Sequence, residues 1–125
     1  MMRSATRFFN DYASALLTYD AEKIAGFYQV PMAVYSDQGV LQVTKMKEVV
    51  DFWKEGIQPY KKSGIVKSVP EIVSEEKLSK NIFLCKVSWK NYNENNTEVA
   101  AETNVYILHQ VGAALKISGL IIMAG

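Results

Sequence analysis

The apolar residues in the first part of the chain follow the period of an α-helix. They recur at spacings of three and four residues, at Phe8, Phe9, Tyr12, Ala13, Leu16 and Leu17. This spacing places them on one face of a helix. Ser4 precedes the segment and has the side-chain oxygen that an N-cap needs. We therefore predict a first helix that begins after Ser4 and buries one face.

A second, short helix is predicted after Asp20, whose carboxylate can accept hydrogen bonds from the free N–H groups of a first turn. Its apolar face comprises Ile24, Phe27 and Tyr28. We expect Pro31 to end this helix, because the residue before a proline avoids helical angles.

A third helix is predicted from the apolar stripe formed by Met46, Val49, Val50, Trp53 and Ile57. Thr44 is its expected cap and Pro59 its expected end. Between the second and third helices, residues 30–37 and 39–43 resemble two short strands. The stretch SDQG joins them as a turn, with Gly39 free to take a positive φ.

The second half of the chain is rich in β-branched and aromatic residues, with a period of two. Strands are predicted at 64–73, 81–92, 97–110 and 115–123, separated by the polar runs SEEKLSKN and NENN and by a turn at Gly112. Pro70 indicates an edge position or a bulge. The short connections favour an antiparallel meander. We predict one α+β domain over residues 1–125, with three N-terminal helices packed on a strongly curved, mostly antiparallel sheet.

Composition narrows the possible partners. The chain has 125 residues, a formal net charge of +1 and one cysteine, Cys85. The balanced charge offers no basic field for nucleic acid, and a single cysteine cannot form an internal disulfide. No apolar run has the length of a membrane span, and Asn10 and Asp11 interrupt the N-terminal apolar segment, unlike a signal peptide. We expect a cytoplasmic protein with no nucleic-acid or membrane partner.

The stretch DYASALLTYDAEKIAGFYQVPMAVYSD, residues 11–37, resembles the start of ketosteroid isomerases. The predicted order of helix, helix, hairpin, helix and meander resembles the nuclear transport factor 2-like superfamily. That superfamily includes ketosteroid isomerases and polyketide cyclases of the SnoaL-like type. The resemblance implies a cystatin-like cone that encloses an apolar pocket, often in a homodimer. It supports the fold more than the activity.

The resemblance also implies candidate catalytic positions. The tyrosine that donates to the oxyanion corresponds to Tyr12, and a second donor corresponds to Asn104. The catalytic base corresponds to Ser36, one residue before Asp37. Because strand side chains alternate between faces, Asp37 would point away from a cavity that Ser36 faces. We therefore interpret Asp37 as a turn residue rather than a base.

Alternation on the strand 97–110 places Glu102, Asn104 and Tyr106 on one face. If this face lines the cavity, the three polar groups bind something or one another, and Glu102 is the best alternative base. If it faces water, they form an ordinary polar surface, which is the interpretation we favour for Glu102. His109 has no partner at metal-ligand spacing, so no metal site and no cofactor are predicted.

The predicted pocket joins these polar groups to aromatic side chains, which pack either around a ligand or into a filled core. The residues expected to line it are Tyr12, Tyr28, Ser36, Trp53, Trp89, Asn104 and Tyr106, with Phe52, Tyr60 and Tyr92 as further aromatic candidates. The main hypothesis is a non-catalytic pocket for a small hydrophobic molecule. One alternative is an isomerase, dehydratase or cyclase with Tyr12 and Asn104 as oxyanion donors and Asp37 or Glu102 as base. The other is a dimeric protein-interaction module.

Overall fold

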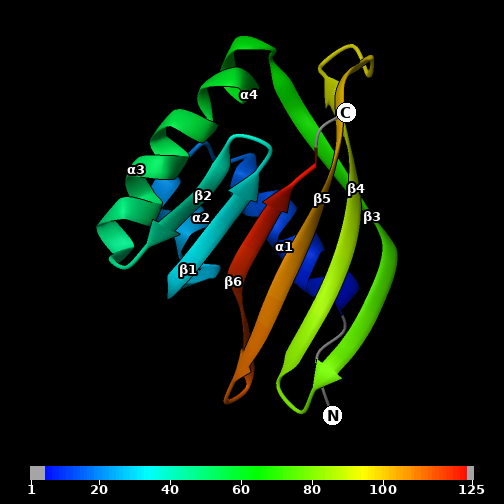
Figure 1. Ribbon diagram of the computed structural model, residues 1–125. Coiled ribbons are helices and arrows are strands. Elements are labelled where there is room, and N and C mark those ends of the chain that lie inside the picture. The colour runs from blue at the N-terminus through cyan, green and yellow to red at the C-terminus, as the bar shows by residue number, and fades with distance from the viewer. Residues whose placement is uncertain (1–4, 124–125) are drawn as a thin grey trace.

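The computed structural model describes residues 5–123, which form four helices and six strands. The elements are α1 (Ala5–Leu16), α2 (Ala21–Ala25), β1 (Tyr28–Ser36), β2 (Gly39–Val43), α3 (Met46–Gly56), α4 (Gln58–Lys62), β3 (Ile65–Ser79), β4 (Ile82–Asn93), β5 (Glu98–Val111) and β6 (Ala114–Ile122). Figure 1 shows the helices gathered on one side of a curved sheet. The predicted α+β class, with helices packed on a curved, mostly antiparallel sheet, is confirmed.

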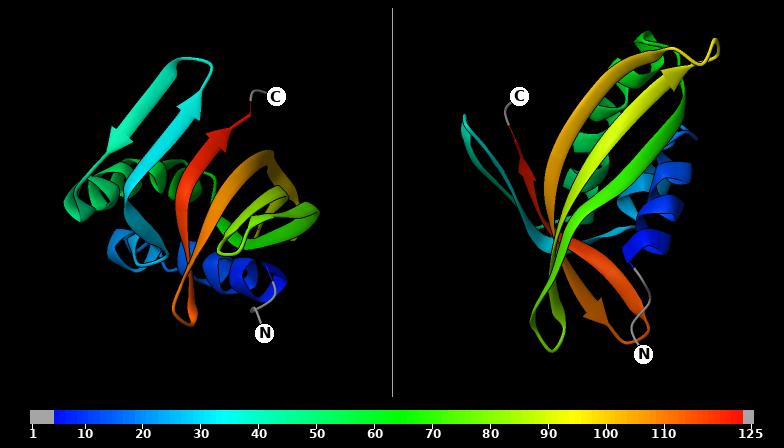
Figure 2. Two further views of the ribbon diagram at one scale, coloured as in Figure 1. Left: turned by 60° about the horizontal axis from the view of Figure 1, so that its bottom comes forward. Right: turned by 90° about the vertical axis from the view of Figure 1, so that its right-hand side faces the viewer.

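The sheet has the strand order β2-β1-β6-β5-β4-β3. All neighbouring strands are antiparallel except β1 and β6, which run parallel, so the predicted meander is joined to the hairpin through the last strand. The two views in Figure 2 show the long strands β3 to β5 bending around the helical layer. This curvature leaves room between α1, α3 and the concave face of the sheet, which is where the site described below lies.

The helix starts follow from local hydrogen bonding. The Asp20 carboxylate accepts from the backbone N–H groups of Glu22 and Lys23, as predicted. The predicted cap Thr44 is wrong by one residue, because α3 begins after Lys45. The Glu48 carboxylate instead accepts from the N–H groups of Thr44 and Lys45, and these bonds lower the pKa of Glu48. Ser4 lies outside the described residues.

Both proline predictions for helix ends are wrong. The second helix ends at Ala25, so Tyr28 begins β1 and Pro31 lies inside that strand. Pro59 lies in the first turn of α4 rather than ending α3. A first-turn N–H has no intrahelical acceptor, so a proline is tolerated at this position without loss of a hydrogen bond.

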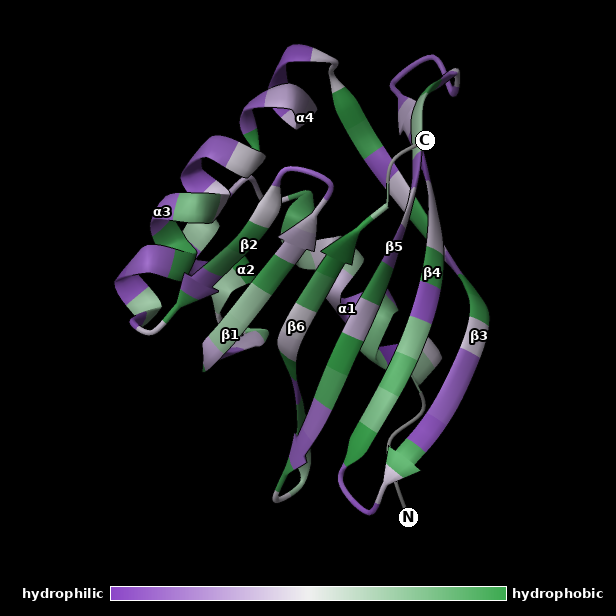
Figure 3. Ribbon diagram, viewed as in Figure 1, coloured by the Kyte–Doolittle hydropathy of each residue, from purple (hydrophilic) through white to green (hydrophobic). Residues whose placement is uncertain are grey.

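The polar run SEEKLS was predicted as a connection but forms the second half of β3. Figure 3 shows this part of the strand as mostly hydrophilic, with a hydrophobic stretch at its end. β3 is an edge strand, and charged side chains on an edge are compatible with strand structure because one side stays in water. Pro70 lies in the same edge strand, as predicted. The turn between β3 and β4 is thereby reduced to Lys80 and Asn81.

The core lies between α1 and the concave face of the sheet. The apolar stripe of α1 is buried as predicted, with Phe8, Phe9 and Tyr12 each at most 5% exposed. The Phe9 ring packs against Tyr106 of β5 and Trp89 of β4, with ring centroids 4.8 and 6.4 Å away. These aromatic contacts hold α1 across the sheet, and they fix one wall of the adjoining cavity.

Candidate functional site

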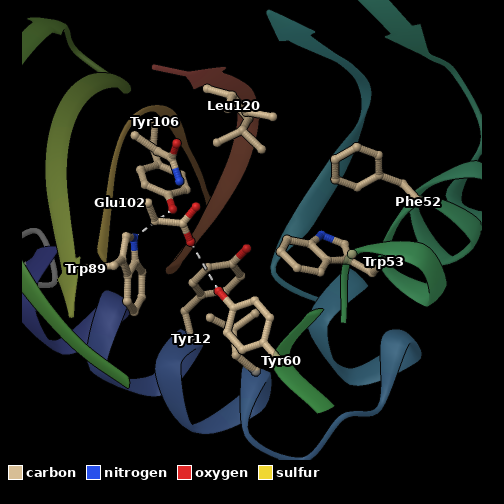
Figure 4. Close-up of a pocket in the computed structure, with 12 residues that line it drawn as sticks. Tyr12, Phe52, Trp53, Tyr60, Trp89, Glu102, Tyr106 and Leu120 are labelled. Atoms are coloured by element: carbon tan, nitrogen blue, oxygen red, sulfur yellow. Dashed lines mark hydrogen bonds between the residues drawn. The ribbon is translucent and has the colours of Figure 1, made fainter. Parts of the chain in front are cut away.

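A cavity of about 190 Å³ opens between the helices and the concave face of the sheet. Figure 4 shows Trp89 and Tyr106 on one side of it and Trp53 and Phe52 on the other. The lining residues come from α1, α3, α4 and the last three strands: Tyr12, Leu16, Phe52, Trp53, Gly56, Tyr60, Trp89, Glu102, Asn104, Tyr106, Leu120 and Ile122. The wall is therefore mainly apolar and aromatic, with a few polar groups set into it.

Tyr12 of α1 and Tyr28 of β1 form a hydrogen-bonded pair, with their hydroxyl oxygens 2.6 Å apart. Burial raises the pKa of both phenols, so both stay protonated at neutral pH. Two hydroxyls that share one hydrogen bond hold a second proton that the bond does not use. The pair can therefore donate a hydrogen bond, and Tyr12 is the member that lines the cavity.

Trp89, Tyr106 and Asn104 form a second polar group on the sheet. The Trp89 Nε1–H donates to the Tyr106 hydroxyl at 2.9 Å. Burial raises the pKa of Tyr106, while the Asn104 amide and the Trp89 N–H oppose that rise by stabilising the anion. Because the Tyr106 oxygen already accepts, its own O–H is free to donate.

Asn104 is 8% exposed, and its Oδ1 atom is buried without a hydrogen-bond partner among residues 5–123. A buried acceptor that has lost water and gained no donor costs about 1–3 kcal/mol. Native proteins contain few such groups, and each calls for an explanation. Here the unpaired oxygen belongs to a residue of the cavity wall.

Trp53 of α3 closes the opposite side. Its Nε1 is buried and has no partner of normal hydrogen-bond geometry among the described residues. Burial raises the pKa of Tyr28, and the hydroxyl of Tyr12 and the indole N–H of Trp53 oppose that rise by stabilising the anion. A Cβ atom at Gly56 would lie 2.9 Å from Cε3 of Trp53. Glycine at this position therefore leaves the space that the Trp53 indole ring occupies.

Glu102 stands at the mouth of the cavity. Its side chain is exposed, and the Tyr60 hydroxyl of α4 donates to Oε1 at 3.3 Å. Burial raises the pKa of Tyr60, and the negative charge of Glu102 raises it further. Glu102 is the only charged residue that lines the cavity in the described part of the chain. Glu102 was interpreted as a residue that faces water, and its side chain is indeed exposed. The same side chain also borders the cavity.

The structure brings most of the predicted site residues together. Tyr12, Trp53, Trp89, Glu102, Asn104 and Tyr106 all line the one cavity, and Tyr28 lies behind Tyr12. Ser36 and Asp37 do not. Asp37 is exposed in the β1–β2 turn, and the Ser36 hydroxyl accepts from the backbone N–H of Gln38. The expectation that Ser36 faces the pocket is therefore wrong, and Asp37 has the turn position that its neighbours indicated.

Sequence reasoning missed four lining residues: Leu16, Gly56, Leu120 and Ile122. Leu16 follows Tyr12 by one helical turn, so the apolar stripe contained the signal. Leu120 and Ile122 alternate on β6 and carried the same kind of signal. For Gly56 no local pattern exists, because its role depends on the ring that packs over it. Tyr92 was a candidate for the wall but lies outside it, with the Lys67 ammonium 5.2 Å from its ring centroid.

The remaining chemically active side chains lie elsewhere. The His109 Nδ1 is 3.1 Å from Oε1 of Gln29. Cys85 is fully buried in β4, and burial raises the pKa of its thiol to about 11. Among residues 5–123, no group of three or more histidine, cysteine or acidic side chains is arranged to hold a metal ion. None of the helices in that range is long and apolar enough to cross a bilayer.

Comparison with known proteins gives a consistent picture of the fold. The profile of an NTF2-like protein family, DUF6841, matches residues 3–124. A domain of unknown function with a cystatin-like fold from Nostoc punctiforme superimposes with a TM-score of 0.73 at 15% identity, over 96% of this chain and 74% of that chain. An NTF2-like protein of unknown function from Shewanella oneidensis gives 0.72 at 13% identity, over 94% of each chain.

A ketosteroid isomerase-like protein from Erwinia carotovora gives a TM-score of 0.64 at 11% identity, over 98% of this chain and 97% of that chain. No curated protein shows significant sequence similarity to the chain. At these identities the structural matches establish the fold and leave the activity open. The predicted relationship to the nuclear transport factor 2-like superfamily, and the cystatin-like architecture, are confirmed.

Proposed function

Because the chain belongs to the NTF2-like protein family DUF6841, we propose that its cavity is the binding site of a small, mainly apolar molecule. The observation that carries the proposal is the unpaired Oδ1 of Asn104, which is buried in an otherwise apolar and aromatic wall. Ligand sites typically combine such a wall with a few convergent polar groups. A bound molecule that donates to Asn104 would supply the missing partner.

The size of the cavity supports a ligand with a single ring. An apolar cavity of about 150 Å³ is large enough to bind benzene. The cavity here measures about 190 Å³, so it matches one ring with a short substituent. It is too small to enclose a four-ring steroid. The volume therefore argues against full enclosure of a steroid, the substrate of the isomerases that the chain resembles.

The arrangement of polar groups favours binding over catalysis. An isomerase or dehydratase needs a base held against the reacting C–H bond. Asp37 lies in an exposed turn and does not line the cavity, so it is not placed to act as this base. Glu102 is the remaining carboxylate, but it is exposed and already accepts from Tyr60. The enzyme alternative is left with Tyr12 and Asn104 as donors and Glu102 as base, which do border one cavity.

We also expect a cytoplasmic homodimer, as the resemblance and the composition imply. Exposed apolar side chains on the edge strand and on β5, such as Val66, Val73 and Val99, would suit a contact between copies. In this proposal the contact between copies stabilises the fold, and the binding function belongs to the cavity. A protein-interaction role alone would leave the buried, unpaired Oδ1 of Asn104 without an explanation.

Thermal stability measured with a panel of single-ring compounds tests the proposal. A ligand that binds only the folded protein stabilises it and so raises Tm. At a free ligand concentration one hundred times the Kd, the free energy of unfolding rises by about 2.7 kcal/mol. Ile122 borders the cavity and is 39% exposed, so Ile122→Trp should block the mouth and abolish the shift. Leu78→Trp, on the exposed part of β3, is the matched control and should retain it. Equal shifts in both variants would place binding outside the cavity and refute the proposal.

A further inference from the structure

We propose that the cavity selects single-ring molecules that carry a protonated amine, with the ammonium group held between Asn104 and Glu102. This inference rests on the proposed function, since it names the class of ligand for the same cavity. It depends on where the unused acceptors are, on the sign of the charge at the mouth, and on the aromatic wall. Each of these is a separate observation.

The wall of the cavity contains one buried polar atom that requires a donor. The Oδ1 atom of Asn104 is buried and unpaired, and a carbonyl oxygen can only accept. Among the other polar groups of the wall, Tyr12 is paired with Tyr28 and Trp89 with Tyr106, while the buried Nε1–H of Trp53 is an unpaired donor that an acceptor on the same ligand would satisfy. A ligand that brings an N–H group relieves the penalty at Asn104, whereas a purely apolar ligand leaves it in place.

The mouth of the cavity carries negative charge. Glu102 lies two residues before Asn104 on β5, so both side chains project from the same face of the sheet. Tyr60 donates to only one of the carboxylate oxygens, so further donors can be accepted. The described residues that line the cavity include no lysine, arginine or histidine. An anionic ligand would therefore meet repulsion without a counter-ion, while a cation is attracted.

The wall between these groups is aromatic. Trp53 and Trp89 face each other across the cavity with Tyr60 and Glu102 between them (Figure 4). Tryptophan and tyrosine rings attract cations through their negative faces. The phenols of the wall are neutral at pH 7, since a phenol ordinarily titrates near 10 and burial raises the pKa of each further. An aromatic wall with one carboxylate at its mouth suits an ammonium group on a ring-sized apolar body.

Four probes of nearly equal size separate this inference from the proposed function: benzylamine, benzyl alcohol, toluene and benzoate. Their Kd values are measured by NMR titration of the full chain at pH 7 and low salt. Benzylamine should bind more tightly than benzyl alcohol, and at least about tenfold more tightly than benzoate. If toluene or benzyl alcohol binds but benzylamine is equal or weaker, the inference fails and the proposed function stands. If none of the four binds, the proposed function itself fails.

Two variants assign the selectivity to named groups. Glu102→Gln should weaken benzylamine about fivefold and leave benzyl alcohol unchanged, as expected for one partly exposed ion pair. Asn104→Leu should weaken both donor probes about fivefold to tenfold and leave toluene unchanged or tighter. Glu98→Gln, on the exposed first residue of β5 and outside the cavity, is the control and should change nothing. An unchanged preference for benzylamine in Glu102→Gln overturns the inference.

Discussion

Replacing Asn104 by leucine should make the ligand-free protein more stable. The unpaired Oδ1 costs about 1–3 kcal/mol, and leucine has a similar shape without a polar atom to desolvate. The substitution also removes the stabilising contact of the Asn104 amide with Tyr106, worth about 1 kcal/mol. The expected net gain is about 1 kcal/mol in the free energy of unfolding. For a chain of this length, that corresponds to a rise in Tm of about 3–5 °C.

The assay is urea unfolding followed by circular dichroism, with Tm measured in parallel. Asn91 on the neighbouring strand β4 provides a matched control. It is 2% exposed, and its Oδ1 accepts from the Ser68 hydroxyl at 2.6 Å. Asn91→Leu leaves that hydroxyl buried and unpaired, so it should destabilise the protein by about 1–3 kcal/mol. The two asparagines are both buried on adjacent strands, and the predicted effects have opposite signs.

The reasoning is refuted if Asn104→Leu destabilises the protein as much as Asn91→Leu does. That result would mean the Asn104 amide is satisfied in the free protein. The cavity would then lack the feature that distinguishes a ligand site from a packing gap. A stabilised Asn104→Leu that also loses affinity for donor ligands would indicate that stability is sacrificed for binding at this position.

Three further predictions concern the surroundings of the cavity. Gly56→Ala should lower the free energy of unfolding in urea by about 1 kcal/mol and weaken toluene binding. The new Cβ would collide with the Trp53 ring, which its aromatic neighbours hold in place. Unchanged toluene binding would contradict this prediction. Tyr28→Phe leaves the buried Tyr12 hydroxyl without its partner and should cost about 1–2 kcal/mol, whereas a neutral effect would show that Tyr12 has another partner. Burial raises the pKa of Cys85 from 9.0 to about 11, so its contribution to stability is complete below pH 9 and is lost as pH rises towards 11. The urea midpoint should fall over that range, and less steeply in Cys85→Ala; equal slopes would show that the thiol does not contribute.

Several local patterns were read correctly from the sequence, whereas the cap at Thr44 and the helix ends at Pro31 and Pro59 were not, and Met46 of the predicted α3 stripe is exposed. The apolar stripes of α1 and α3 and the turn before Gly39 depend on spacing and on backbone preference, and both are visible in one segment. Other errors came where a distant element decides. The polar second half of β3 forms a strand only because β4 supplies its hydrogen-bonding partner. Pro31 was expected to stop a helix, yet it lies in a strand that pairs with β2 and β6.

The features of the cavity also divide into those that the local sequence determines and those that the tertiary structure determines. Alternation along β5 was enough to place Glu102, Asn104 and Tyr106 on one face, because the period of a strand is a property of the backbone. Which face is enclosed depends on α1 packing against the concave side of the sheet, and no pattern within β5 contains that information. Only the folded chain leaves Oδ1 of Asn104 buried without a donor while Glu102, two residues away, reaches water. Hydrogen-bond satisfaction depends on all neighbours at once, and those neighbours come from segments far apart in the sequence.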